Sequence, residues 1–288
     1  MHKIAILGCE NSHADNFLGI IKNSYTDIDV LGVYSYDEEA SKRLNEKYGV
    51  YIAKSYDEFV GKVDGIIITA RDGRNHYKYA KPYIKSGIPM FVDKPITSDE
   101  VEAVEFMKEL RDNGCRVSGG SSCVHAPLVK ELAEKLAEKS PEKVYGGFLR
   151  APISLVNDYG NFFFYSQHLV QVMQTIYGYY PKSVKAYQNG NVLSVTVRYE
   201  NYDVALQYTD GDWRYVATLS YEKNFEGGLY SVGPDESNAE FAEFYNILTG
   251  GEQHQSYRDF IAPVAVLCAI DRSMRSGNEE LVNPVEEI

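Results

Sequence analysis

The sequence lacks several features that would place it in a particular class of protein. It has four cysteines among 288 residues, irregularly spaced and without a CxxC pair, which argues against a disulfide framework and a structural zinc site. No apolar run is long enough to span a membrane, and an apolar strand at residues 3–7 leaves no room for a signal peptide. Acidic residues outnumber basic ones, 41 to 29, without a basic stripe. We therefore expect a cytoplasmic protein with no metal, no nucleic-acid partner and no membrane partner.

The length and composition predict two domains, 1–121 and 122–288, because 288 residues with 44% hydrophobic content can fill two cores of ordinary size. In the first domain, short apolar segments alternate with segments of helical periodicity. The apolar segments are 3–7, 30–34, 65–69, 89–92 and 116–119. Such alternation predicts an α/β fold, a doubly wound parallel sheet of the Rossmann type with helices on both faces.

The second half has a different pattern. Segments of period two are separated by turn signals, among them Asn189-Gly190, Asp210-Gly211 and Gly227-Gly228, and helices are predicted at 127–139, 236–248 and 257–276. This predicts an α+β domain with an antiparallel sheet. Many of the 24 tyrosines lie in its strands, so one broad aromatic face must be covered by helices or by another subunit. We expect a homo-oligomer, a dimer or a tetramer.

The first strand-to-helix turn lacks most of the glycines of a dinucleotide-binding GxGxxG turn. It reads Gly8-Cys9-Glu10-Asn11-Ser12-His13, with an anion at the second glycine position. Asn11, Ser12 and His13 could donate hydrogen bonds to phosphate or ribose. Alternatively, Asn11 and Ser12 only cap the helix, and the sequence leaves both interpretations open.

The second strand lacks the acid that usually binds the ribose of NAD at its carboxyl end. That position holds Tyr34 and Ser35, and Asp37 comes too late. We interpret Asp37 as an early helix residue, with Ser35 and Glu38 spaced as a capping box. The sequence therefore does not choose between NAD and NADP.

The segment Phe91-Val92-Asp93-Lys94-Pro95 is the most informative one in the chain. A lysine at the carboxyl end of a buried strand lies where open α/β sheets bind ligands, and burial would lower its pKa enough for proton transfer. The alternative is a surface lysine in a loop. Thr69 and Ala70 end another strand at the same crevice, and the cation of Arg71 follows them; that cation either binds phosphate or is simply solvated.

The order of Gly8, Thr69, His76 and Asp93-Lys94-Pro95 resembles the glucose-fructose oxidoreductase and inositol 2-dehydrogenase (Gfo/Idh/MocA) family, as a divergent branch. The resemblance implies NAD or NADP as cofactor. The cofactor-binding residues that we expect are Gly8, Glu10, Asn11, Ser12, Tyr34, Ser35, Thr69, Ala70, Arg71, Asp93 and Lys94. It also implies that Lys94 contacts the nicotinamide and the substrate hydroxyl.

A later helical segment, Tyr165-Ser166-Gln167-His168, resembles the family's helix that carries the acid/base histidine. His168 matches that histidine, and Tyr165 is a further candidate catalytic residue. The alternative for His168 is a core histidine, because apolar residues lie on nearby turns. The segment departs from the family at Phe164, which stands where an aspartate is common.

These residues predict an oxidoreductase that transfers hydride between nicotinamide and a hydroxyl or keto carbon of a small sugar, polyol or cyclitol-like substrate. The altered glycine turn and Phe164 leave open an alternative, a catalytically inactive protein of the same fold that binds NAD(P) or a sugar. A third interpretation is a subunit that serves assembly only.

Overall fold

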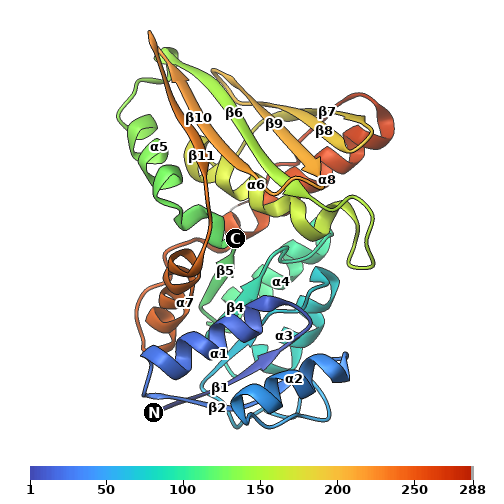
Figure 1. Ribbon diagram of the computed structural model, residues 1–288, viewed down its shortest axis with the longest axis vertical. Helices are drawn as coiled ribbons and strands as arrows, with labels where there is room; N and C mark the ends of the chain where they lie inside the picture. Colours follow the sequence, from blue (N-terminus) through green and yellow to red (C-terminus); the bar gives the residue numbers. More distant parts are fainter. Residues whose placement is uncertain (287–288) are drawn as a thin grey trace.

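The computed structural model describes residues 1–286 (Figure 1); residues 287 and 288 of the predicted second domain lie outside this part. The first half of the chain forms a five-stranded parallel sheet in the order β2-β1-β3-β4-β5. Its strands are β1 (His2–Leu7), β2 (Ile28–Tyr34), β3 (Gly65–Ile68), β4 (Met90–Asp93) and β5 (Val117–Gly120). The prediction of a parallel Rossmann sheet is confirmed.

Both faces of this sheet are buried, as the continuous apolar strands predicted. Ile4 and Ile6 point to one face, and Ala5 and Leu7 point to the other, because successive side chains of a strand alternate. The helices that follow the strands are α1 (Ser12–Ser24), α2 (Glu38–Tyr48), α3 (His76–Ile84) and α4 (Glu100–Asp112). α1 and α2 contribute to the core on the Ile4 face, and α3 and α4 to the core on the other.

The last two helices of the chain return to the first sheet. Phe241 and Phe244 of α7 (Pro234–Leu248) pack in the core beneath α1, and Phe260 and Ile261 of α8 (Tyr257–Ser276) pack in the core beside α4. The later half of α8 packs in the core of the second sheet instead. The two sheets are thus joined by helices that serve both cores, and the boundary at residues 121/122 stays a prediction.

The second sheet has seven strands in the order β11-β10-β6-β9-β8-β7-β12. They are β6 (Val144–Ile153), β7 (Ser183–Asn189), β8 (Val192–Arg198), β9 (Asp203–Asp210), β10 (Tyr215–Tyr221), β11 (Asn224–Tyr230) and β12 (Glu279–Leu281). α5 (Pro127–Ala137) and α6 (Phe162–Tyr177) cover one face (Figure 1). An α+β second half is confirmed, but the sheet is mixed and not purely antiparallel, because β6 and β9 run parallel.

Two local predictions are wrong. Gly227 and Gly228 do not form a turn: they lie inside β11 and pair with Thr218 and Ala217 of β10, where a Cβ on Gly227 would collide with the neighbouring strand. Likewise Asp37, not Ser35, caps α2, and its carboxylate accepts hydrogen bonds from the first turn of the helix. In the first case, glycines that lie within a strand were assigned to a turn. In the second case, the cap of α2 was assigned to a residue two positions too early.

No helix within residues 1–286 is both long and apolar enough to cross a lipid bilayer. The face of the second sheet away from α6 carries exposed apolar side chains, including Tyr187, Phe225 and Leu229. The homo-oligomer and the cytoplasmic location stay predictions.

Candidate active site

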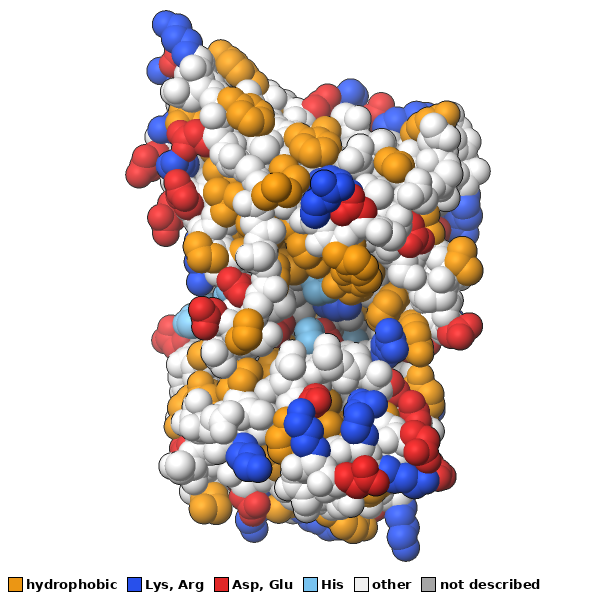
Figure 2. Space-filling model, in the orientation of Figure 1, with side chains coloured by type: hydrophobic (Ala, Val, Ile, Leu, Met, Phe, Trp, Pro, Cys, Tyr) orange, Lys and Arg blue, Asp and Glu red, His pale blue; other side chains and the backbone are white. Residues whose placement is uncertain are grey.

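A cleft of about 700 Å³ lies between the two halves of the molecule. Figure 2 shows it as a hollow across the middle of the surface, with pale blue histidine and blue basic side chains inside it. One wall comes from the β1–α1 turn and the carboxyl end of β4, and the other from α6, β10 and the 3₁₀ turn Ser122–His125. The cleft therefore opens at the carboxyl edge of the parallel sheet, where ligands of such sheets bind.

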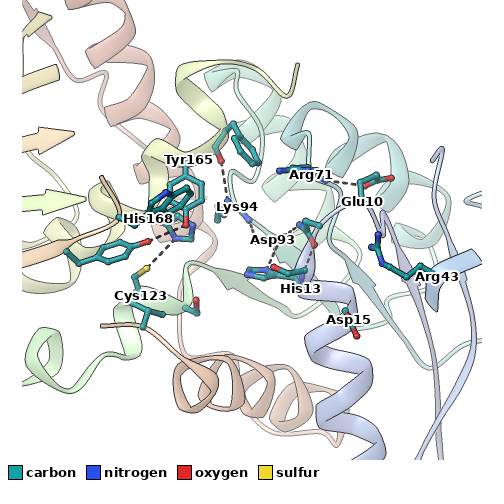
Figure 3. A pocket seen from close by; sticks show the side chains of 17 residues that line it. Glu10, His13, Asp15, Arg43, Arg71, Asp93, Lys94, Cys123, Tyr165 and His168 are labelled. Carbon is teal, nitrogen blue, oxygen red and sulfur yellow. Dashed lines mark hydrogen bonds and ion pairs between the residues drawn. The ribbon is translucent and has the colours of Figure 1, made fainter. Parts of the chain in front are cut away.

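Lys94 follows β4 directly and projects into this cleft (Figure 3). Only 7% of the residue is exposed. Its Nζ donates a hydrogen bond to the carbonyl of Phe164 (3.2 Å) and lies 4.9 Å from the ring centre of Tyr165. Burial lowers the pKa of the Lys94 amine, and the nearby Asp93 carboxylate opposes this only in part.

His168 lies on α6, on the opposite wall. Its Nδ1 is 2.6 Å from the hydroxyl of Ser121 and 3.5 Å from the thiol of Cys123. The ring centre is 4.6 Å from that of Tyr165. Burial, reinforced by the Lys94 cation, lowers the pKa of His168 well below its usual value, so the imidazole is neutral at pH 7.

Tyr165 connects these two groups, since its ring contacts both the Lys94 amine and the His168 imidazole. Its hydroxyl lies 3.3 Å from that of Tyr215, and its ring packs edge-on against Trp213, 5.4 Å between centres. The three predicted catalytic residues are thus brought to one place. Phe164, where the family often has an aspartate, offers only its ring face and its carbonyl to Lys94.

Asp93 is the centre of a buried polar cluster on the first wall. One carboxylate oxygen lies 2.9 Å from His13 Nδ1 and accepts a hydrogen bond from Asn11, while the other accepts from the Lys94 backbone N–H. Burial disfavours both charges, but their mutual attraction outweighs it: the pKa of His13 is raised to about 9, and that of Asp93 is held below its usual range. His13 and Asp93 therefore form an ion pair at neutral pH.

The predicted donors of the first turn are mostly engaged within the protein. Asn11 caps α1 by accepting from the His13 N–H, as one of the two sequence interpretations held. Ser12 is exposed and lines the cleft. The carboxylate of Glu10 lines it too, and accepts hydrogen bonds from the Ser35 hydroxyl (2.5 Å) and the Arg71 N–H (3.2 Å).

Five of the predicted cofactor-binding residues do not line the cleft: Gly8, Tyr34, Ser35, Thr69 and Ala70. Gly8 has φ +81°, and a Cβ there would collide with Ala70, so the turn and the end of β3 pack with backbone against backbone. The hydroxyl of Thr69 donates to the Gly8 carbonyl. Tyr34 accepts the Gly8 N–H with its carbonyl, while its ring packs on Tyr79.

Arg71 lines the cleft, where its guanidinium stacks on the rings of Tyr159 (4.4 Å) and Phe164 (5.3 Å). Arg74, the other cation of that loop, pairs with Asp72 instead. Buried His76 braces the loop, with its two ring nitrogens 2.7 and 2.9 Å from the carbonyls of Pro95 and Ala70. Of these three residues, only Arg71 is placed to meet a ligand.

Sequence reasoning missed several residues that line the cleft: Asp15, Arg43, Ser122, Cys123, Trp213, Tyr215 and Val232. It also missed Glu240 on α7, which is 3% exposed and whose carboxylate oxygens have no hydrogen-bond partner. Burial raises the pKa of Glu240 to about 8, although His13 opposes the shift. Glu240 lies one residue before Phe241 and four before Phe244, on the apolar face of α7. An acid on the apolar face of a predicted helix is the sequence signal that could have identified this buried carboxylate.

The donors in the cleft suit a dinucleotide. Three cations, Arg43, Arg71 and Lys94, line it together with the hydroxyls of Ser12 and Ser122, beside the amino end of α1. Such a set matches a pyrophosphate and two riboses. Within residues 1–286, no group of three or more His, Cys, Asp or Glu side chains is arranged to hold a metal ion.

The model of an oxidoreductase family described as an NAD-binding Rossmann fold, GFO_IDH_MocA, matches residues 2–121. The first domain of the chain thus matches the Gfo/Idh/MocA family. A comparison with curated proteins gives no match.

Solved structures share the fold over nearly the whole chain. GenD2 from gentamicin A biosynthesis, crystallised with NAD, is 14% identical with a TM-score of 0.83, covering 98% of this chain and 97% of that one. The WlbA dehydrogenase of Bordetella pertussis, with NADH and UDP-GlcNAcA, is 15% identical with a TM-score of 0.81 and 99% coverage of both chains. A myo-inositol dehydrogenase of Corynebacterium glutamicum is 16% identical with a TM-score of 0.79 and 99% coverage of both. These likenesses establish a shared fold over both halves of the chain.

Proposed function

We propose that this Gfo/Idh/MocA protein is an NAD(P)-dependent dehydrogenase that oxidises a hydroxyl carbon, or reduces a keto carbon, of a small sugar, polyol or cyclitol. One observation carries the proposal. The Lys94 amine and the His168 imidazole, which are 74 positions apart in sequence, lie 4.9 and 4.6 Å from the same Tyr165 ring in one cleft. That cleft also contains the amino end of α1 and three cations.

The cofactor would lie along the first sheet, held by Arg43, Arg71, Ser12 and Ser122. When bound, it supplies the nicotinamide carbon that accepts or returns the hydride. The protein must then handle one proton, because an alcohol that loses hydride must also lose its hydroxyl proton.

Lys94 is placed to accept that proton. Burial favours the neutral amine, which is the form that can act as a base. The aromatic rings of Phe164 and Tyr165 then stabilise the ammonium that results, since each ring face lies about 5 Å from Nζ.

His168 would act as a hydrogen-bond donor to the same oxygen. The Cys123 N–H donates to the Ser121 oxygen, so the Ser121 hydroxyl proton is free to donate to His168 Nδ1. Its own proton is then on Nε2, the nitrogen that Ser121 leaves free for the substrate. The neutral imidazole thus holds the oxygen while Lys94 takes its proton.

The substrate side of the cleft is aromatic. Trp213 is 67% exposed, and it stands next to Tyr165 and near Tyr215 on the wall opposite the sheet. A large exposed ring beside an acid/base pair suits the apolar face of a sugar or cyclitol ring. The names of the similar structures, a myo-inositol dehydrogenase and a protein bound to UDP-GlcNAcA, support this substrate class.

The test is a screen of polyols, aldoses and cyclitols with NAD⁺ and NADP⁺, in which reduced nicotinamide is followed by absorbance and cofactor binding is measured separately by calorimetry. We expect binding of a dinucleotide and turnover of at least one cyclic polyol, with turnover lost in Lys94→Met. Binding without turnover of any compound would favour the inactive binding protein that Phe164 leaves open. No cofactor binding at millimolar concentration would overturn the proposal altogether.

A further inference from the structure

The adenosine end of the cleft contains an unusual acid. In dinucleotide-binding sheets of this kind, the residue at the carboxyl end of the second strand supplies the carboxylate that binds the ribose hydroxyls. Here β2 ends at Tyr34, and the next residue, Ser35, has no charge. The Glu10 carboxylate from the first turn lies 2.5 Å from the Ser35 hydroxyl and lines the cleft (Figure 3).

We propose that Glu10 replaces the missing acid of the second strand and makes the protein selective for NAD over NADP. This inference rests on the proposed function, because it assumes that a dinucleotide binds in the cleft. Glu10 stands at the second glycine position of the GxGxxG pattern, where a bulky anion would be expected only to obstruct the pyrophosphate. In this proposal the same carboxylate binds the ribose instead.

The contacts of Glu10 hold its carboxylate in a defined place. One oxygen accepts from Ser35 after β2, and the other accepts from the Arg71 N–H after β3. The side chain therefore spans the end of β1, which lies between those two strands. A carboxylate held from both sides is a fixed group in the crevice and not a mobile surface charge.

Glu10 retains the capacity to bind a ribose. Each oxygen of a carboxylate can accept two hydrogen bonds, and each oxygen of Glu10 has one protein donor. The two hydroxyls of an NAD ribose can fill the remaining positions. A 2′-phosphate would instead bring about two negative charges against the carboxylate, which itself has no hydrogen to donate to the phosphate.

Two arginines, Arg43 and Arg71, also line the cleft. The Arg71 guanidinium is stacked on the rings of Tyr159 and Phe164. The Arg43 side chain is exposed. It therefore remains the group that could attract a 2′-phosphate, and this gives the proposal a definite way to fail.

The experiment measures the dissociation constants of NAD⁺ and NADP⁺ by calorimetry, without substrate or turnover, for the unaltered protein and for Glu10→Gln. We expect the unaltered protein to bind NAD⁺ at least about tenfold more tightly, a difference that one fixed charge readily produces. In Glu10→Gln the ratio should fall at least about tenfold, because NAD⁺ binding weakens and NADP⁺ binding improves.

Two further variants isolate the cause. Asp15→Asn also removes a carboxylate from the cleft, but that group is turned to Lys47 and Tyr48, so the ratio should stay as in the unaltered protein. Ser35→Ala keeps the charge and removes its tether, and should lower the ratio less than Glu10→Gln does. It also provides a second measurement if Glu10→Gln does not fold.

The outcomes distinguish a failure of the role of Glu10 from a failure of the proposed dehydrogenase function. If the unaltered protein binds NADP⁺ as well as NAD⁺, or if Glu10→Gln keeps the original ratio, the role of Glu10 is overturned while the dehydrogenase proposal stands. If neither cofactor binds the unaltered protein, both are overturned.

Discussion

The two walls of the cleft each contain a buried histidine, and the two histidines differ in charge. On the first wall His13 lies against the Asp93 carboxylate, and its pKa is raised to about 9. On the second wall His168 lies against the hydroxyl of Ser121, and burial lowers its pKa well below the usual value. At neutral pH one is an imidazolium and the other a neutral ring.

This difference shows that the partner decides the charge, since both rings are largely removed from water. A carboxylate makes His13 a fixed cation that neutralises Asp93 beside Lys94. A hydroxyl brings no charge to His168, so burial keeps that ring neutral. The first wall is therefore suited to holding charge in place, and the second to making hydrogen bonds with a substrate.

The largest effect should come from Lys94, which extends from the first wall toward the second. We expect Lys94→Met to lower kcat by about a thousandfold, within the range typical of a lost acid/base group. Lys94→Arg should not restore activity, because a guanidinium does not release its proton. Steady-state kinetics and cofactor binding of both variants check this. Activity above about a tenth of the original in either one would exclude Lys94 as the base.

Sequence patterns predicted the first sheet well because its strands are buried on both faces and read as continuous apolar runs. The end of an apolar strand indicated Lys94, and the family resemblance of a helical segment indicated His168 and Tyr165; all three line the cleft. Sequence patterns did not find Trp213, which lines the cleft from the loop before β10, or Glu240, which is buried on α7. They also missed the pairing of His13 with Asp93, because the two residues are distant in sequence and meet only where β1 and β4 lie in one sheet.

The ion pair of the first wall should contribute to stability. We expect Asp93→Asn to lower the free energy of unfolding by about 3 kcal/mol at pH 7, because it leaves His13 buried without its counter-charge. The raised pKa of His13 means that the stabilisation is complete below about 6.5 and is lost as pH rises through about 9. The penalty of Asp93→Asn should therefore shrink by pH 10. Urea titrations at pH 5, 7 and 10 measure it, and a constant penalty at all three values would rule out the ion pair.

Glu240 gives a second pH dependence behind the same wall, and here too stability falls as pH rises. Its pKa rises from 4.5 to about 8 on folding, so the unfolded chain loses this proton first and stability falls as pH rises between those values. We expect Glu240→Gln to raise the free energy of unfolding by about 2–4 kcal/mol at pH 8 and by little at pH 4. The exposed Glu134→Gln on α5 is the control and should change nothing. Equal stabilisation of Glu240→Gln at both pH values would show that the effect is not one of charge.

The smallest effect should come from Trp213 at the rim of the second wall. We expect Trp213→Ala to raise the KM for a cyclic polyol about tenfold with kcat nearly unchanged, since the ring contacts substrate but no reacting atom. Trp213→Phe should recover most of the loss. A fall in kcat at unchanged KM would place Trp213 in the acid/base machinery instead.

The most direct test of the two-wall account is the protonation state of the two histidines, read from long-range ¹H–¹⁵N spectra of the unaltered protein between pH 5 and 10. His13→Gln and His168→Gln variants assign the signals. The account predicts an imidazolium at His13 that titrates near pH 9, and a neutral ring at His168 with its proton on Nε2 throughout. Two histidines that titrate together near pH 6.5, or a proton on Nδ1 of His168, would contradict it.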